Sequence, residues 1–266
     1  MIDYKNVCSL TVEVAKKAGA FIRNERAWFK TTAVEYKGLN DLVSYVDKTA
    51  EDLIIASLKK ILPESGFIAE EGTEAASNQH LQWIIDPLDG TTNFVHGIPC
   101  FCVSIALQAG NEIVVGVVYE INLDECFYTF KDAPSFLNGI EIKVSDTVLM
   151  QQSLIATGFP YTKFERKSAY MEVFEVCMHQ THGLRRLGSA AADLAYVACG
   201  RFEAFYEYGL KPWDVAAGVL LVKNAGGLVS DFKGGDNVIF GNDIIASNAG
   251  IHQEFLQIVI SKFNGA

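Results

Sequence analysis

The chain has 266 residues, a formal net charge of −10 and an apolar fraction of 50%. This length suits one compact unit or two closely packed lobes, and the apolar content is sufficient for a large core. The 32 acidic and 22 basic residues argue against a protein that binds a nucleic-acid backbone through clustered Lys and Arg. They are compatible with phosphate binding through recruited cations.

Neither the start of the sequence nor its cysteines indicate an exported or membrane protein. No basic lead precedes an apolar run, so we expect no secretory signal, and no apolar stretch reaches the length of a membrane span. Scattered cysteines without a CxxC pair indicate reduced core thiols in a cytoplasmic protein. Cys100 and Cys102 alternate along a strand-like segment, but a soft-metal site needs four converging N or S ligands.

The first half of the chain is predicted to pack helices on a mainly antiparallel sheet. Helical spacing marks two helices, the second ended by Pro63, with inward-facing positions Leu10, Val14, Ala18, Phe21, Ile22, Ala50, Leu53, Ile54, Leu58 and Ile61. Strand signals, with a hairpin turn at 109–111 and a tight turn at Asn138-Gly139, cover 66–69, 82–85, 101–107, 113–119, 125–130 and 140–144.

The second half alternates strands with helices, which predicts a layered α/β arrangement. Strand signals cover 153–156, 203–206 and 228–231, and helix signals cover 165–179, 190–198, 214–225 and 253–263. We therefore expect an N-terminal α+β lobe over 1–145 and a C-terminal α/β lobe over 146–266, joined in one compact unit.

The segment with the strongest chemical signal is Asp86-Pro87-Leu88-Asp89-Gly90-Thr91-Thr92. A buried strand is predicted to end at Asp86, Pro87 to turn the chain, and a helix to open from Asp89. Two carboxylates three residues apart across a turn repel each other unless protons or a hard cation such as Mg²⁺ intervene. Amides at the helix start favour phosphate. Alternatively, Asp89 only caps the helix and Asp86 only ends the strand.

Other acidic residues lie where they could join this pair. Glu70 and Glu71 end the preceding strand and would lie beside Asp86 if the two strands pair. Asp214 follows Pro212 at the start of a late helix, and Asp47 opens the second helix. None of these residues is diagnostic alone, since single acidic residues at helix starts are common.

Taken together and in order, these segments resemble the signature motifs of the inositol monophosphatase family. The resemblance spans nearly the whole chain and is carried by Lys37…Asp41-Leu42-Val43…Asp47, Glu70-Glu71, Asp86 to Phe94, Gly188-Ser189-Ala190-Ala191 and Trp213 to Gly218. It implies a layered α/β/α/β/α sandwich with the active site between the lobes. It also implies Mg²⁺-dependent phosphomonoesterase activity with two to three ions, a homodimer and inhibition by lithium.

The resemblance also implies roles for individual residues. One metal ion would be held by Glu70, Asp86 and the backbone carbonyl of Leu88, and a second by Asp86, Asp89 and Asp214. Asp47 and Thr91 would act with Glu70 as catalytic residues that orient the attacking water. Substrate contacts would be Asp89, Gly90, Thr91, Ala190 and Glu207.

We expect direct in-line attack of water, without a phospho-enzyme, on inositol 1-phosphate or a related sugar or polyol monophosphate. Thr92, at a position where the bisphosphate nucleotidases typically carry Lys, favours this branch of the family. Alternatives are a broad fructose-1,6-bisphosphatase or a nucleotide 3′-phosphatase. An alternative of another class is an interaction partner of the transcription machinery. Arg185 and Arg186 are interpreted as an interface or anion-binding pair, or as ordinary surface residues.

Overall fold

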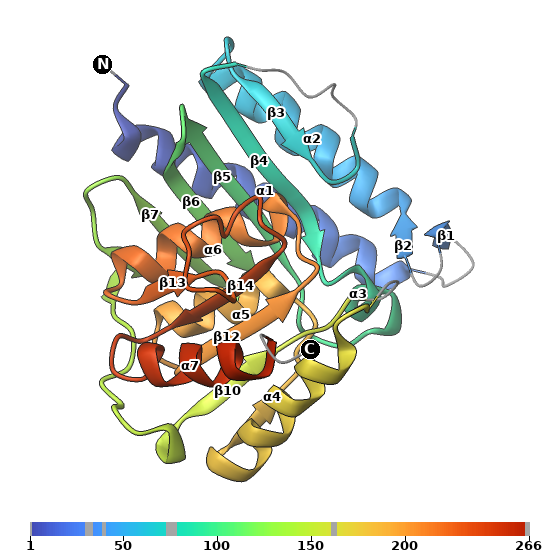
Figure 1. Cartoon of the computed structure of the whole chain (residues 1–266). Coiled ribbons are helices and arrows are strands. Elements are labelled where there is room, and N and C mark those ends of the chain that lie inside the picture. Colours follow the sequence, from blue (N-terminus) through green and yellow to red (C-terminus); the bar gives the residue numbers. More distant parts are fainter. Residues whose placement is uncertain (1, 30–33, 39–40, 73–78, 161–163, 264–266) are drawn as a thin grey trace.

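A computed structural model describes residues 2–29, 34–38, 41–72, 79–160 and 164–263, without the side chains of residues 34–38 and 41–43. Two β-sheets and three layers of helices alternate along the molecule (Figure 1). None of the described helices has the length and apolar character needed to cross a membrane.

The larger sheet has seven strands and comes entirely from the first half of the chain. Its order is β3 (Gly66–Ala69), β4 (Leu81–Asp89), β5 (Cys102–Ala109), β6 (Glu112–Glu120), β7 (Glu125–Phe130), β8 (Ser135–Leu137) and β9 (Ile140–Ile142). Only the β3–β4 pair is parallel, so the prediction of a mainly antiparallel sheet is confirmed.

Two long helices, α1 (Tyr4–Trp28) and α2 (Tyr45–Ile61), cover the outer face of this sheet (Figure 1). Asp3 caps α1 by accepting a hydrogen bond from the amide of Asn6 at 3.2 Å. Leu10 and Leu53 were expected to face inward but are 41% and 45% exposed, because each lies at the edge of the buried stripe of its helix. The short pair β1 (Val34–Gly38) and β2 (Asp41–Ser44), which was not predicted, precedes α2.

The second sheet has five strands from the later part of the chain. Its order is β11 (Gly183–Arg185), β10 (Leu154–Thr157), β12 (Ala204–Tyr208), β14 (Asp243–Ser247) and β13 (Leu228–Ser230). β10 is parallel to both neighbours, and the other two pairs are antiparallel. β11 and β14 were missed by sequence analysis.

Helices α5 (Ala190–Ala198) and α6 (Pro212–Asn224) lie between the sheets and share one core with both of them. α6 comes so close to the large sheet that a Cβ added to Gly116 of β6 would lie 2.8 Å from the Ala217 carbonyl oxygen. α4 (Lys167–Gln180) and α7 (His252–Phe263) cover the far face of the second sheet. The layers therefore follow the expected α/β/α/β/α order. The boundary at residue 145 stays a prediction, since the shared core joins the two halves.

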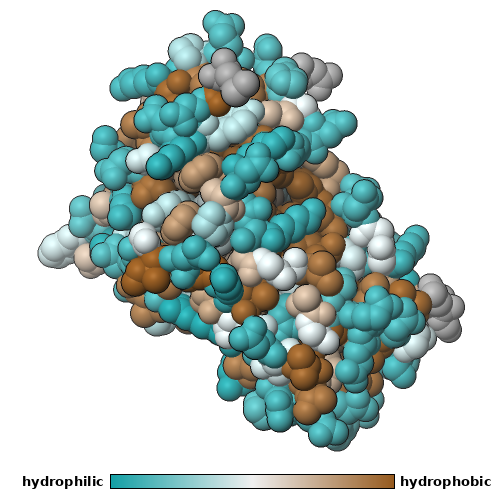
Figure 2. Space-filling model, turned by 90° about the vertical axis from the view of Figure 1, so that its left-hand side faces the viewer, coloured by the Kyte–Doolittle hydropathy of each residue, from teal (hydrophilic) through white to brown (hydrophobic). Residues whose placement is uncertain are grey.

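Much of the surface seen in Figure 2 is hydrophilic, with apolar side chains showing between polar ones. The six cysteines are free thiols, four of them buried, as expected for core cysteines. Cys102 contacts Ser189, with 3.2 Å between Sγ and Oγ, so its nearest polar neighbours belong to a hydrogen-bond network rather than to a thiolate metal site.

Candidate active site

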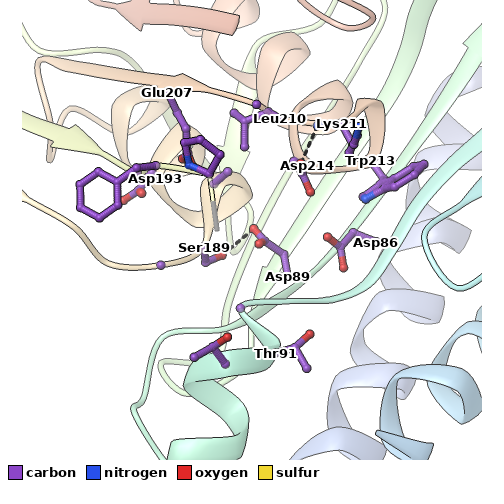
Figure 3. A pocket seen from close by; sticks show the side chains of 18 of the residues that line it. Asp86, Asp89, Thr91, Ser189, Asp193, Glu207, Leu210, Lys211, Trp213 and Asp214 are labelled. Carbon is purple, nitrogen blue, oxygen red and sulfur yellow. Dashed lines mark hydrogen bonds between the residues drawn. The ribbon is translucent and has the colours of Figure 1, made fainter. Parts of the chain in front are cut away.

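A cavity of about 370 Å³ opens at the end of β4, bounded by the starts of α3 (Thr91–His96), α5 and α6. Figure 3 shows Asp86, Asp89 and Asp214 grouped on one side of it, with Thr91 below them and Glu207 and Asp193 farther away. The residues predicted as metal ligands, Glu70, Asp86, Leu88, Asp89 and Asp214, all line this cavity. The predicted substrate residues Gly90, Thr91, Ala190 and Glu207 line it as well.

Asp86 and Asp89 both belong to β4, which differs from the expected strand ending at Asp86. In the register with β5, Asp86 is opposite Ser104 and Asp89 is opposite Cys102, so β4 carries an extra residue between them. Such a bulge accommodates Pro87, which has no amide to donate to a regular ladder. The bulge brings both carboxylates to the cavity, and the amide of Leu88 donates to Asp86 Oδ1 at 2.9 Å.

Glu70 reaches Asp86 through the pairing of β3 with β4. Ala69 is opposite Ile85, and the Glu70 amide donates to the Ile85 carbonyl at 3.2 Å, so Glu70 lies beside Asp86 as the strand-pairing argument predicted. Burial raises the pKa of Asp86 well above its ordinary value, and the charges of Glu70, Asp89 and Asp214 raise it further. The backbone amide of the neighbouring Glu71 donates to Glu51 Oε2 at 2.8 Å.

Asp214 comes to the site on the first turn of α6, where Pro212 opens the helix. Its Oδ2 accepts a hydrogen bond from the Lys211 amide at 2.7 Å, which fixes the side chain at the helix start. Burial raises the pKa of Asp214 well above its ordinary value, followed by the negative charge of Asp89.

Asp89 joins β4 to the start of α5. Its Oδ2 accepts hydrogen bonds from the Ser189 hydroxyl and the Ala191 amide, each at 2.7 Å. Burial nevertheless raises the pKa of Asp89 to about 6, because the loss of solvation outweighs these stabilising hydrogen bonds. Ser189 also caps α5 by accepting from the Ala192 amide at 3.3 Å, so the site and the helix share this residue.

Asp47 and Thr91, predicted to work as a pair, are in direct contact. Thr91 Oγ1 lies 2.9 Å from Asp47 Oδ1 and 3.0 Å from the Leu88 carbonyl oxygen. The other oxygen of Asp47 accepts from the amide and the hydroxyl of Ser44 at 2.9 and 2.7 Å, which forms a capping box at the start of α2. Burial raises the pKa of Asp47, although hydrogen bonds from Ser44 and Thr91 oppose the shift.

Gly90 has φ of 97°, a left-handed conformation that glycine adopts without strain, just before α3. An added Cβ would also lie 3.0 Å from the Cys100 carbonyl oxygen. The turn after Asp89 therefore depends on glycine, and it places Thr91 against Asp47.

The part of the cavity away from the Asp86–Asp214 group is lined by Glu207, Asp193 and Arg186. Glu207 projects from β12, and burial raises its pKa to about 8. Arg186 follows β11 and lines the cavity, and the interface or anion-binding role stays a prediction. Asp193 was missed, although its spacing of three from Ala190 on a predicted helix was a signal that both face the same side.

The donor set suits a hard divalent cation, because it consists of carboxylate and carbonyl oxygens. Burial raises the pKa of Asp86, Asp89 and Asp214, and repulsion from neighbouring carboxylates adds to the shifts of Asp86 and Asp214; bound cations would stabilise the charged forms. Within the described part of the chain, no three His, Cys, Asp or Glu side chains are already gathered closely enough to hold an ion. The side chains of Lys37 and Asp41, which carry part of the resemblance, lie outside the described residues.

This chain belongs to the inositol monophosphatase family, whose model matches residues 3–264. It is 41% identical over 253 residues to the inositol-1-monophosphatase of Mesorhizobium japonicum, covering 94% of this chain and 95% of that protein. It is also 41% identical over 241 residues to the Nus factor SuhB of Escherichia coli K12, covering 90% of each.

Solved structures of relatives have the same fold. The extragenic suppressor protein suhB of Bartonella henselae superposes with a TM-score of 0.90 at 38% identity, covering 96% of this chain and 98% of that one. The inositol monophosphatase of Anabaena superposes with a TM-score of 0.85 at 34% identity, covering 97% and 96%. The family and the layered fold expected from the motifs are thus both confirmed.

Proposed function

We propose that the protein is a Mg²⁺-dependent phosphomonoesterase that hydrolyses inositol 1-phosphate or a related polyol or sugar monophosphate. The observation that supports this proposal best is the convergence of Glu70, Asp86, Asp89 and Asp214 on one cavity. Four carboxylates, one directly after β3, two from β4 and one from α6, lie around this cavity, and divalent cations with a phosphate dianion would balance their charge. The relative named inositol-1-monophosphatase, at 41% identity, supports the same conclusion.

In this proposal Glu70, Asp86 and the Leu88 carbonyl hold one ion, and Asp86, Asp89 and Asp214 hold a second. When bound, two such ions neutralise the phosphoryl oxygens, promote loss of a proton from water and stabilise the departing oxygen. Asp86 serves both ions, so its loss has the largest expected effect on activity. A third ion near Glu70 remains part of the prediction.

Thr91 and Asp47 have a defined part in positioning the attacking water. The Thr91 hydroxyl has one proton, and the Asp47 carboxylate at 2.9 Å accepts it. The lone pairs of Thr91 are then free to accept a hydrogen bond from water, while Glu70 supplies a second acceptor. Ser189 is occupied by Asp89, with 2.7 Å between their oxygens, and this argues for water rather than the serine as nucleophile.

Substrate binding divides along the cavity. In this proposal the amides of Gly90 and Thr91 bind the phosphoryl group and Ala190 and Glu207 contact the polyol; all four residues line the cavity. Fructose 1,6-bisphosphate or a nucleotide 3′-phosphate are the alternative substrates within the same proposal. A cytoplasmic homodimer and inhibition by lithium complete it.

A phosphate-release panel tests this function. Inositol 1-phosphate, fructose 1,6-bisphosphate, 3′-phosphoadenosine 5′-phosphate and a dinucleotide phosphate are compared with Mg²⁺ and with a chelator. We expect inositol 1-phosphate to be preferred, the chelator to abolish release, and Asp86→Asn to lower it at least 100-fold. Asp52→Asn, on the exposed face of α2, is the matched control. Equal rates on all four substrates would contradict the substrate assignment, and an active Asp86→Asn protein would contradict the metal-binding scheme.

Binding to the transcription machinery is a second proposal, favoured by the 41% identity to proteins named Nus factor SuhB. Affinity purification of wild-type and Asp86→Asn proteins separates the two roles. A stoichiometric transcription protein retained equally by both would support an interaction independent of catalysis, and its absence from both would contradict this second role.

A further inference from the structure

Asp193 is a buried cavity residue to which neither the sequence motifs nor the proposed reaction gives a role. It lines the same cavity as the acidic cluster, yet it is only 1% exposed. In Figure 3, Asp193 and Glu207 lie together on the side away from Asp86 and Asp214. One carboxylate oxygen of Asp193, Oδ1, accepts no hydrogen bond from the described residues.

A buried carboxylate oxygen without a donor is unfavourable, and native proteins rarely retain one without a functional reason. The charged groups nearest to Asp193 do not remove this deficit. They are the carboxylates of Glu207 and Asp89, which repel it, and the guanidinium of Arg186, which attracts it, while Oδ1 still lacks a hydrogen-bond donor among the described residues. Arg186 is placed over the ring of Phe159, 5.4 Å from its centroid.

The position of Asp193 is set by α5. Ala190 and Asp193 are three residues apart on this helix, so they share the face that is turned to the cavity. The start of α5 is fixed to β4, because Ser189 and Ala191 both donate to Asp89 at 2.7 Å. Asp193 is therefore held on a rigid element, one helical turn beyond the start of α5.

Glu207, on the same side of the cavity as Asp193 (Figure 3), is held by close packing. A Cβ added to Gly158 would lie 2.1 Å from Glu207 Oε2, so the carboxylate packs directly against this glycine. Asp193 and Glu207 supply four carboxyl oxygens, and the positive charge of Arg186 lies close to both groups. A ligand that satisfies such a set carries several adjacent hydroxyl groups, each of which donates one hydrogen bond and accepts another.

We propose that Asp193 accepts hydrogen bonds from hydroxyls of the leaving polyol and so makes the enzyme prefer hydroxyl-rich phosphomonoesters. This inference rests on the proposed function and refines it. The phosphoryl end is served by other residues, so Asp193 acts on the leaving group and not on the reacting phosphorus.

The test compares kcat/KM for inositol 1-phosphate with that for 4-nitrophenyl phosphate, whose leaving group carries no such hydroxyls. Wild type, Asp193→Asn, Asp193→Ala and the Asp52→Asn control are measured with Mg²⁺. The inhibition constant of inorganic phosphate reports on the phosphoryl end, and urea unfolding reports on stability. We expect the ratio of the two kcat/KM values to fall at least tenfold in Asp193→Ala and by a smaller factor in Asp193→Asn, which keeps one acceptor oxygen.

We also expect most of the change to be in KM for inositol 1-phosphate, with the phosphate inhibition constant within about twofold of wild type. Equal losses on both substrates, or an unchanged ratio, would overturn the inference. If Asp193→Ala does not fold, the nearly isosteric Asp193→Asn decides by the same ratio. A wild-type protein that hydrolyses neither substrate would overturn the proposed function and this inference together, whereas an active wild type with an unchanged ratio overturns the inference alone.

Discussion

Glu207 allows a sharp prediction about how stability depends on pH. Its side chain is buried, and the loss of solvation raises its pKa from 4.5 to about 8, with the Arg186 charge opposing the shift and the Asp89 charge adding to it. The folded state therefore holds a proton on Glu207 in a pH range where the unfolded chain has lost it. Glu207 therefore makes its full contribution to the free energy of unfolding below pH 4.5, and this contribution is lost as the pH rises to about 8.

The size of the effect follows from proton linkage. A group that binds one more proton in the folded state than in the unfolded state lowers the free energy of unfolding by about 1.4 kcal/mol per pH unit. Between pH 5 and 8, ionisation of Glu207 should thus lower stability by about 4 kcal/mol, a large fraction of the 5–15 kcal/mol typical of a domain. Glu207→Gln removes the charge and should remove this part of the slope.

The assay is urea unfolding of the metal-free protein at half-unit steps from pH 5 to 8, in the presence of a chelator. We expect the free energy of unfolding of Glu207→Gln minus that of wild type to increase by about 1.4 kcal/mol per pH unit across this range. Glu254→Gln, on an exposed position of α7, controls for the loss of a carboxylate elsewhere. A difference between Glu207→Gln and wild type that stays constant with pH would refute the argument that burial governs this site.

Three further predictions concern the cavity. Thr91→Val removes the donor to Asp47 Oδ1, so we expect the free energy of unfolding in urea to fall by about 1–3 kcal/mol and the rate of phosphate release to fall at least 100-fold. Thr91→Ser keeps the hydroxyl and should retain most of the stability and activity. Equal activity of the two variants would contradict the role of the hydroxyl. Gly158→Ala places a Cβ 2.1 Å from Glu207 Oε2 and must displace this carboxylate. We therefore expect KM for inositol 1-phosphate to rise at least tenfold in steady-state kinetics. An unchanged KM would show that Glu207 does not contact the substrate. In calorimetry, Mg²⁺ should raise Tm more at pH 8 than at pH 6, because Asp89 has a pKa of about 6 and binds the ion in its charged form. A smaller rise in Tm at pH 8 than at pH 6 would contradict a role of Asp89 as a metal ligand.

Elements with strong periodicity were predicted well from the sequence. α5 was placed at Ala190–Ala198 and β3 at Gly66–Ala69, with the bounds that the structure shows. β14 (Asp243–Ser247) was missed. The order of strands in the second sheet depends on contacts between distant segments, which local patterns do not encode.

The candidate site shows the same division. The acidic motif and the Asp47–Thr91 contact were anticipated, but β4 was expected to end at Asp86, because Pro87 ordinarily interrupts a ladder. The structure continues the strand to Asp89 through a bulge, which needs the register of β5 to be seen. Asp193 was missed for a different reason, since one aspartate in an alanine-rich helix matches no motif. Its spacing from Ala190 was a weak signal, and its missing donor is seen only in the structure.

The acidic cluster leads to a last prediction, in which activity and stability change in opposite directions. Asp86→Asn keeps an oxygen to accept the Leu88 amide, now at 2.9 Å from Oδ1, but it removes a charge that burial, Glu70, Asp89 and Asp214 all oppose. Because the pKa of Asp86 is raised, ionising it destabilises the folded state increasingly as pH rises, and the substitution removes that penalty. Metal-free Asp86→Asn should therefore unfold at higher urea than wild type at pH 8, with a smaller difference at pH 5.

With Mg²⁺ the order should reverse, because only wild type retains the ligand shared by both ions. The assay is the urea midpoint at each pH, measured once with chelator and once with Mg²⁺, for wild type, Asp86→Asn and the Asp52→Asn control. It reports both the stability difference without metal and its reversal with Mg²⁺. An Asp86→Asn protein less stable than wild type without metal would show that Asp86 is held by favourable contacts within the fold. The cluster would then be a structural feature, and the repulsion from which we infer cation binding would not exist.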